Sequence, residues 1–276
     1  MLSSTEKINI LVTLDENYIP YLNVMLSSLL HSNPETCFDV YLLHSSISEG
    51  SLKDTKRILN NQGCLIPIKA DDLWLDNAPT TSRYPKEMYF RIFAALYLPQ
   101  SLDRVLYLDP DIVVNGSVSK LYNLPMDDYY FAAASHVGGV LRAVNALRLD
   151  MESDSPYINS GVMLMNLNRL RNEQKYDVVF DFIEKRKNRF ILPDQDIISS
   201  LYGTKIFTLN PFQYNMTELL YQQHHPFEKD LTIDWIRSHS VIIHYCGRNK
   251  PWKNNYVGQL DVFYYEALER MKCKLK

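Results

Sequence analysis

Two aspartates follow directly after a run of apolar residues in the middle of the chain. Residues 105–111 read VLYLDPD, so only a proline separates Asp109 from Asp111. Proline fixes its own φ angle and biases the preceding residue toward an extended conformation, in which alternate side chains point the same way. The two carboxylates are therefore expected to converge. Removing them from water is costly unless a positive charge lies between them, and a divalent cation with oxygen ligands is the natural candidate.

A second segment, HYCGRNKPW at residues 244–252, has side chains that could bind a metal or a phosphate. His244 suits a transition metal such as Mn²⁺ beside carboxylates, Gly247 allows a ligand close to the backbone, and Lys250 can place a positive charge on a phosphate. An Asp-x-Asp triplet alone can equally cap a turn or face water. A lone histidine is more often structural. The combination of the two segments is what favours a site for a metal and a phosphate.

The apolar pattern predicts the elements that must bring these segments together. Strands and helices alternate with short links, which indicates an α/β domain whose mostly parallel sheet has helices on both faces. Ligands bind such sheets beyond the carboxyl ends of strands, and Asp15 and Asp109 each follow a predicted strand. We expect one domain over residues 1–276, with a possible lid at 77–85. The predicted strands are 8–14, 38–43, 65–69, 104–108, 131–135, 161–167 and 241–243, and the predicted helices begin near residue 20 and cover 47–61, 86–97, 176–183, 194–202 and 260–271.

Composition narrows the classes of function. The 276 residues are 46% hydrophobic, enough for a large core, and the net charge of −3 argues against a nucleic-acid partner. Four scattered cysteines, the lack of an apolar N-terminal signal and the lack of a long apolar run predict a cytoplasmic protein. Residues 244–276 carry seven Lys and Arg against three Asp and Glu, with several aromatics. This C-terminal region could contact an anionic membrane surface peripherally, or be an ordinary solvated helix face.

Six segments, in order along the chain, resemble the motifs of glycosyltransferase family 8. This family contains bacterial lipopolysaccharide and lipooligosaccharide galactosyl- and glucosyltransferases and glycogenin. Each motif alone is moderately specific, but six in the family's order make chance an unsatisfactory explanation. The segments are LDENY at 14–18, MYFRI at 88–92, LYLDPDIVV at 106–114, YINSGVMLMNL at 157–167, PDQDI at 193–197 and HYCGRNKPW at 244–252.

The resemblance implies a GT-A fold, the Rossmann-like sheet of nucleotide-diphospho-sugar transferases. Residues up to about 125 would bind the nucleotide, and residues 126–276 the donor sugar and acceptor. It further implies a bacterial enzyme that moves galactose or glucose, with retention, from UDP-galactose or UDP-glucose to a glycan or a lipid-linked saccharide. The expected cofactor is Mn²⁺, with Mg²⁺ as the other possibility.

Site residues are carried over position by position. The metal ligands would be Asp109, Asp111 and His244. Retention through a double displacement would need a carboxylate beneath the anomeric carbon, but the matching residue is Gln195, a poor nucleophile. A front-side displacement is therefore favoured, with Gln195 stabilising positive charge and Asp194 as the alternative nucleophile. The expected donor-binding residues are Thr13, Asp15, Asn17, Arg91, Asp109, Asn159, Ser160, Asp194, Gln195, Gly247 and Lys250.

Two positions depart from the bacterial galactosyltransferases. His136 stands where those enzymes carry an aspartate near the donor sugar and acceptor, and Leu192 stands where they carry a tyrosine near the acceptor. The nucleotide and metal are thus better specified than the sugar or acceptor. A protein that binds UDP-sugar without turnover is one alternative. A phosphatase of the haloacid-dehalogenase type is another, but it would leave HYCGRNKPW unexplained.

Overall fold

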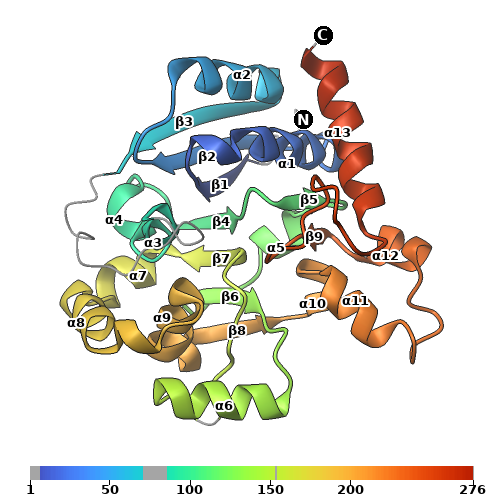
Figure 1. The fold of residues 1–276 in the computed structure, drawn as a ribbon. Coiled ribbons are helices and arrows are strands. Elements are labelled where there is room, and N and C mark those ends of the chain that lie inside the picture. Colours follow the sequence, from blue (N-terminus) through green and yellow to red (C-terminus); the bar gives the residue numbers. More distant parts are fainter. Residues whose placement is uncertain (1–6, 71–85, 153, 276) are drawn as a thin grey trace.

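A seven-stranded sheet with the strand order β3-β2-β1-β4-β7-β6-β8 runs through the molecule (Figure 1). The computed structural model describes residues 7–70, 86–152 and 154–275, so the expected lid at 77–85 lies outside the described residues. Neighbouring strands from β3 to β4 are parallel, β7 is antiparallel to both β4 and β6, and β6 is parallel to β8. The strands are β1 (Lys7–Thr13), β2 (Cys37–His44), β3 (Gly63–Lys69), β4 (Arg104–Leu108), β6 (Phe131–Ala134), β7 (Val162–Asn166) and β8 (Ile206–Leu209).

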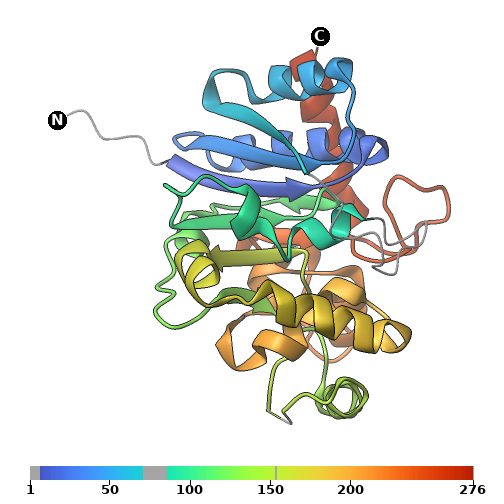
Figure 2. The same ribbon diagram turned by 90° about the vertical axis from the view of Figure 1, so that its left-hand side faces the viewer.

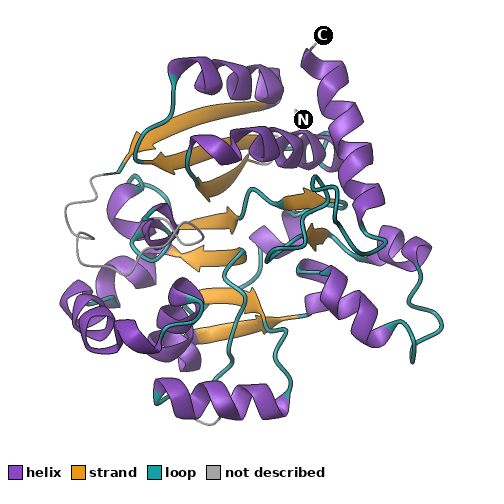
Figure 3. Ribbon diagram, in the orientation of Figure 1, coloured by secondary structure: helices purple, strands orange, loops and turns teal. Residues whose placement is uncertain are grey.

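Helices cover both faces of this sheet (Figure 3). In β1 the side chains of Ile8, Ile10 and Val12 join a core with α1 and α2, whereas Leu11 joins a second core on the opposite face. This alternation follows from the two-residue period of a strand. The expected mostly parallel sheet with helices on both faces is confirmed. The helices are α1 (Ile19–Ser32), α2 (Glu49–Leu59), α3 (Glu87–Phe90), α4 (Ala94–Tyr97), α5 (Ser119–Tyr122), α6 (Gly139–Leu149), α7 (Leu167–Glu173), α8 (Tyr176–Arg186), α9 (Pro193–Tyr202), α10 (Pro211–Tyr214), α11 (Glu218–His224), α12 (Ile233–His239) and α13 (Asp261–Leu275).

A second, two-stranded sheet pairs β5 (Ile112–Val114) with β9 (Ile242–His244) in antiparallel register. Ile112 lies opposite His244, so residues 132 positions apart in sequence become neighbours. Beside this sheet, α11, α12 and α13 enclose a third apolar core. In Figure 2 the loop between β9 and α13 projects from the edge of the molecule. Among the described residues, no helix has the length and apolar character needed to cross a membrane.

The single helix predicted for 86–97 is wrong. The chain forms two short helices there, α3 and α4, with turns at residues 91–93. Residues 87–95 are all buried, so this stretch lacks the solvent-facing side of an ordinary surface helix. The break matters because Arg91 lies in it, with its guanidinium carbon 4.6 Å from the centre of the Tyr107 ring. The sequence also did not reveal β5, β8, α5, α6, α7, α10, α11 and α12.

Candidate functional site

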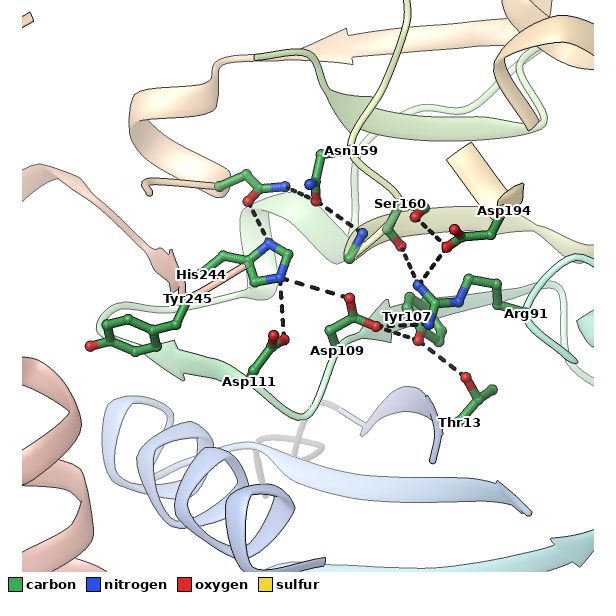
Figure 4. A network of polar contacts seen from close by, with 12 residues as sticks. Thr13, Arg91, Tyr107, Asp109, Asp111, Asn159, Ser160, Asp194, His244 and Tyr245 are labelled. Atoms are coloured by element: carbon green, nitrogen blue, oxygen red, sulfur yellow. Dashed lines mark hydrogen bonds and ion pairs between the residues drawn. The ribbon is translucent and has the colours of Figure 1, made fainter. Parts of the chain in front are cut away.

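Asp109, Asp111 and His244 meet at the carboxyl end of β4 (Figure 4). One ligand atom of each lies within 4.8 Å of the others. His244 Nε2 is 3.2 Å from Asp111 Oδ1 and 3.7 Å from Asp109 Oδ2. The geometry has a simple origin: Asp109 directly follows β4, Asp111 directly precedes β5, and the pairing of Ile112 with His244 brings the histidine alongside.

The donor atoms of this cluster fit a cation. Asp111 Oδ1 and His244 Nε2 are buried and make no hydrogen bond, which is costly for polar atoms unless a ligand satisfies them. The other ring nitrogen, His244 Nδ1, lies 2.9 Å from Asn215 Oδ1. An amide oxygen only accepts, so Nδ1 carries the proton there. In the neutral ring Nε2 then directs its lone pair toward two carboxylates, an arrangement that a divalent cation would stabilise.

Gly161 has no side chain, and this leaves room for Asp109 and His244 to lie close together. A Cβ atom on Gly161 would lie 2.7 Å from Asp109 Oδ2 and would also overlap the His244 ring. The Gly161 carbonyl accepts a hydrogen bond of 2.8 Å from the Asp109 N–H. A side chain at this position would therefore push apart two of the three candidate ligands.

Two basic side chains flank the carboxylates. Arg91 Nη2 lies 3.1 Å from Asp109 Oδ1, and the Lys250 ammonium contacts Asp111 Oδ2. Burial favours the neutral form of Asp111, but Lys250 and His244 outweigh it and hold the pKa of this carboxyl well below its ordinary value. Lys250 also donates to the Tyr245 carbonyl at 2.7 Å. Asp111 is thus held as an anion even before a ligand binds.

Arg91 connects the metal ligands to a second acid, Asp194. Arg91 Nη1 lies 2.9 Å from Asp194 Oδ2, and the same oxygen accepts a 2.6 Å hydrogen bond from the Ser160 hydroxyl. Burial raises the pKa of Asp194, and Arg91 and Ser160 offset part of that effect. The neighbouring Gln195 is only partly buried and lines the same cavity.

A pocket of about 190 Å³ contains most of the expected donor-binding residues. Two expected residues lie differently. Asn17 is exposed and donates its backbone N–H to Asp15 Oδ1 at 2.9 Å, and Lys250 faces Asp111 and the backbone rather than the cavity. The expected residues that line the pocket are Thr13, Asp15, Arg91, Asp109, Asp111, Asn159, Ser160, Asp194, Gln195, His244 and Gly247.

His136 and Leu192, the two positions singled out in the sequence, have different surroundings. Leu192 lines the pocket. His136 does not; it donates through Nε2 to the Asn215 carbonyl at 2.7 Å, and burial lowers its pKa to about 4. His136 is therefore a neutral side chain that supports the neighbouring backbone.

In the PDQD segment the two acids face opposite ways. Asp194 lines the pocket, whereas Asp196 is fully buried and pairs with Arg148 at 2.7 Å. Asp196 also accepts from the Tyr157 hydroxyl at 2.7 Å and from the Ile191 N–H at 2.8 Å. These bonds fix the turn that leads into α9 and so set the position of Asp194.

Sequence reasoning missed three contributors to the site. Tyr107 donates its hydroxyl to Asp109 Oδ1 at 2.6 Å, Gly161 supplies the space described above, and Asn215 contacts His244. Gly161 could have been identified from the sequence, because it is a glycine directly before an apolar strand. No comparable signal in the sequence identified Asn215, because its role depends on a contact with the distant His244.

Comparisons with known proteins identify the family of this chain. The family model described as Glycosyl transferase family 8 matches residues 9–256. A lipopolysaccharide 1,2-glucosyltransferase of Escherichia coli K12 is 26% identical, covering 99% of this chain and 81% of that protein. A lipopolysaccharide 1,3-galactosyltransferase of Salmonella typhimurium is also 26% identical, covering 91% of this chain and 74% of that protein.

Among solved structures, the galactosyltransferase LgtC in complex with donor and acceptor sugar analogues has the same fold. The TM-score is 0.81, the sequence identity 22%, and the match covers 95% of each chain. This likeness identifies the GT-A fold. The family model, which spans most of the sequence, shows that this chain belongs to glycosyltransferase family 8.

Proposed function

We propose that this glycosyltransferase moves galactose or glucose, with retention, from UDP-galactose or UDP-glucose to a glycan or lipid-linked saccharide, using Mn²⁺, or alternatively Mg²⁺. The observation that carries the proposal is the Asp109–Asp111–His244 cluster, flanked by Arg91 and Lys250. Two of its buried atoms, Asp111 Oδ1 and His244 Nε2, make no hydrogen bond. The relatives whose names specify glucosyl or galactosyl transfer to lipopolysaccharide support the choice of sugars and acceptor class.

Departure of UDP creates negative charge on the β-phosphate, and the site is suited to stabilise it. A divalent cation held by Asp109, Asp111 and His244 would supply charge stabilisation to the diphosphate. Lys250 lies next to Asp111 and can share its positive charge with the same phosphate. Gly247 has a φ of +82° and nothing within 4 Å of a Cβ position, so its backbone is accessible to the diphosphate.

The donor sugar would lie between the cation site and Asp194. Arg91 spans this distance, with one nitrogen on Asp109 and another on Asp194. Because Arg91 is buried and rests on the Tyr107 ring, it holds the two acids in a fixed relation. Asp194 and Gln195 can then orient the sugar hydroxyls and the anomeric carbon.

A front-side displacement explains retention with the residues present. In this path the acceptor hydroxyl attacks from the face that UDP leaves, its proton passes to the departing phosphate, and the Gln195 carbonyl stabilises the oxocarbenium-like sugar. The hydrogen-bonding of Asp194 supports this path: one carboxylate oxygen is shared by Arg91 and Ser160, which reduces its nucleophilicity.

Release of UDP from a panel of UDP-sugars tests the class of enzyme without a known acceptor. We expect Mn²⁺-dependent release from one hexose donor, abolished by EDTA. Asp111→Asn removes the charge of one proposed metal ligand with little change in shape. It should lower the rate of UDP release at least about 100-fold, because the loss of one group that stabilises charge in a transition state commonly has an effect of this size. The matched control is Asp39→Asn, which affects an ion pair with Lys7 and should leave the rate unchanged.

The same assay distinguishes the enzyme from a UDP-sugar-binding protein. Mn²⁺-dependent UDP binding that persists while no donor and acceptor combination yields product would favour the binding protein. A chain that does not bind UDP at all would refute the proposal.

Intact-mass spectrometry of Gln195→Ala incubated with donor tests the front-side path. Without an acceptor, only water could release a glycosyl-enzyme intermediate, so any intermediate that formed should accumulate. We expect the mass of the chain to remain unchanged, because Asp194 is engaged by Arg91 and Ser160. An added hexose located on Asp194 by peptide mapping would establish a double displacement instead.

A lipid-linked acceptor would favour a peripheral membrane contact, and the basic groove between α2 and the end of α13 supports one. Lys53, Lys56, Arg57 and Lys274 line this groove. The start of α13 belongs to the core, with Phe263 buried, so truncation would damage the fold.

Charge reversal is therefore the better test of membrane contact. We expect wild-type protein to co-sediment with anionic liposomes and Lys53→Glu/Lys56→Glu/Lys274→Glu to bind more weakly at low salt, because surface charge sets this attraction. Equal, negligible sedimentation of both proteins would contradict the membrane contact.

A further inference from the structure

Asn215 contacts His244 and is fully buried. Its Oδ1 atom accepts from His244 Nδ1 at 2.9 Å, and its Nδ2 atom donates to Asn159 Oδ1 at 3.0 Å. The same Asn159 oxygen accepts from the Gly161 backbone N–H at 3.1 Å. The contacts therefore form a continuous chain from the backbone of Gly161 to the imidazole.

The Gly161 N–H fixes the direction of every hydrogen bond in this series. A backbone N–H can only donate, so the Gly161 N–H requires an oxygen on Asn159. That oxygen requires the amino group of Asn215, and the Asn215 carbonyl oxygen must then face His244. Because this oxygen can only accept, it selects the ring with a proton on Nδ1. His244 Nε2 keeps its lone pair, directed at Asp109 and Asp111.

The backbone around Asn215 is held as firmly as its side chain. Its carbonyl accepts from His136 Nε2 at 2.7 Å, and its N–H donates to the Pro211 carbonyl at 3.0 Å. The next residue, Met216, accepts from the His244 N–H at 2.7 Å. Asn215 and His244 are thus joined through both main chain and side chain, and neither can rotate without breaking several bonds.

We propose that Asn215 is a positioning residue for the candidate metal ligand His244. It holds the imidazole in the tautomer and orientation that present Nε2 to a cation bound by Asp109 and Asp111. This inference rests on the proposed metal-dependent function. It gives His136 and Asn159 a shared role, because both fix Asn215. Hydrogen bonds of this kind to the second nitrogen of a ligating histidine commonly affect metal affinity.

Mn²⁺ affinity tests the proposal independently of turnover. Free Mn²⁺ is followed by electron paramagnetic resonance while the ion is titrated into full-length protein with saturating UDP. We expect Asn215→Leu, which is similar in size but cannot accept a hydrogen bond, to weaken Mn²⁺ binding about 10- to 100-fold. Asn215→Asp loses the donor to Asn159 but keeps an acceptor facing Nδ1, and it should recover most of the affinity lost in Asn215→Leu.

A matched control separates positioning from general destabilisation. Asn33 is also a buried asparagine, with its amide bonded to the Leu29 carbonyl at 2.8 Å and to the Val118 N–H at 3.0 Å. Asn33→Leu should lower the melting temperature comparably and leave Mn²⁺ affinity unchanged. Asp111→Asn reports the loss of a direct ligand.

The outcomes are distinct. Weakened Mn²⁺ binding in Asn215→Leu, rescued in Asn215→Asp and absent from Asn33→Leu, supports the positioning role. Native affinity in Asn215→Leu, with loss only in Asp111→Asn, overturns the role of Asn215 but leaves the proposed function intact. If native protein with UDP binds no Mn²⁺, both the inference and the metal-dependent function are wrong.

Discussion

The placement of two carboxylates side by side, largely withdrawn from water, is the constraint on which the site depends. Asp111 is buried and Asp109 is partly buried, and this is unfavourable unless positive charge and hydrogen bonds compensate. Three side chains from different elements compensate the two carboxylates: Arg91 from the turn after α3, Lys250 from the loop after β9, and His244 from β9 itself. Each compensates one side of the pair, and the atoms between them, Asp111 Oδ1 and His244 Nε2, are those that lack partners.

The topology of the sheet explains how distant segments reach this point. The carboxyl ends of parallel β1 and β4 lie at one edge, which is where Asp15 and Asp109 begin their loops. Because β7 runs antiparallel to β4, its beginning lies at that same edge, and Asn159, Ser160 and Gly161 directly precede it. One reversed strand thus brings a third polar segment to the site, and the Asp109 N–H bonds the Gly161 carbonyl there.

Much of this arrangement was predictable, for reasons that differ between residues. Long apolar strands such as β1 and β4, and the acids that follow them, were evident because periodicity and turn chemistry are local properties. The break at Arg91 was not, because an almost wholly buried segment has no polar side to reveal its geometry. The short strands β5 and β8 gain their stability from pairing rather than from propensity. Asn215 was missed because its role depends on His244, a contact that forms only in the folded chain.

The central claim is that Asp109, Asp111 and His244 together bind a divalent cation. Anomalous diffraction at the Mn absorption edge, from crystals grown with UDP and Mn²⁺, tests it most directly. The account predicts one strong anomalous peak in coordinating contact with all three side chains and with the diphosphate. Well-ordered UDP in the pocket without a peak there, or with Mn²⁺ bound elsewhere, would contradict it.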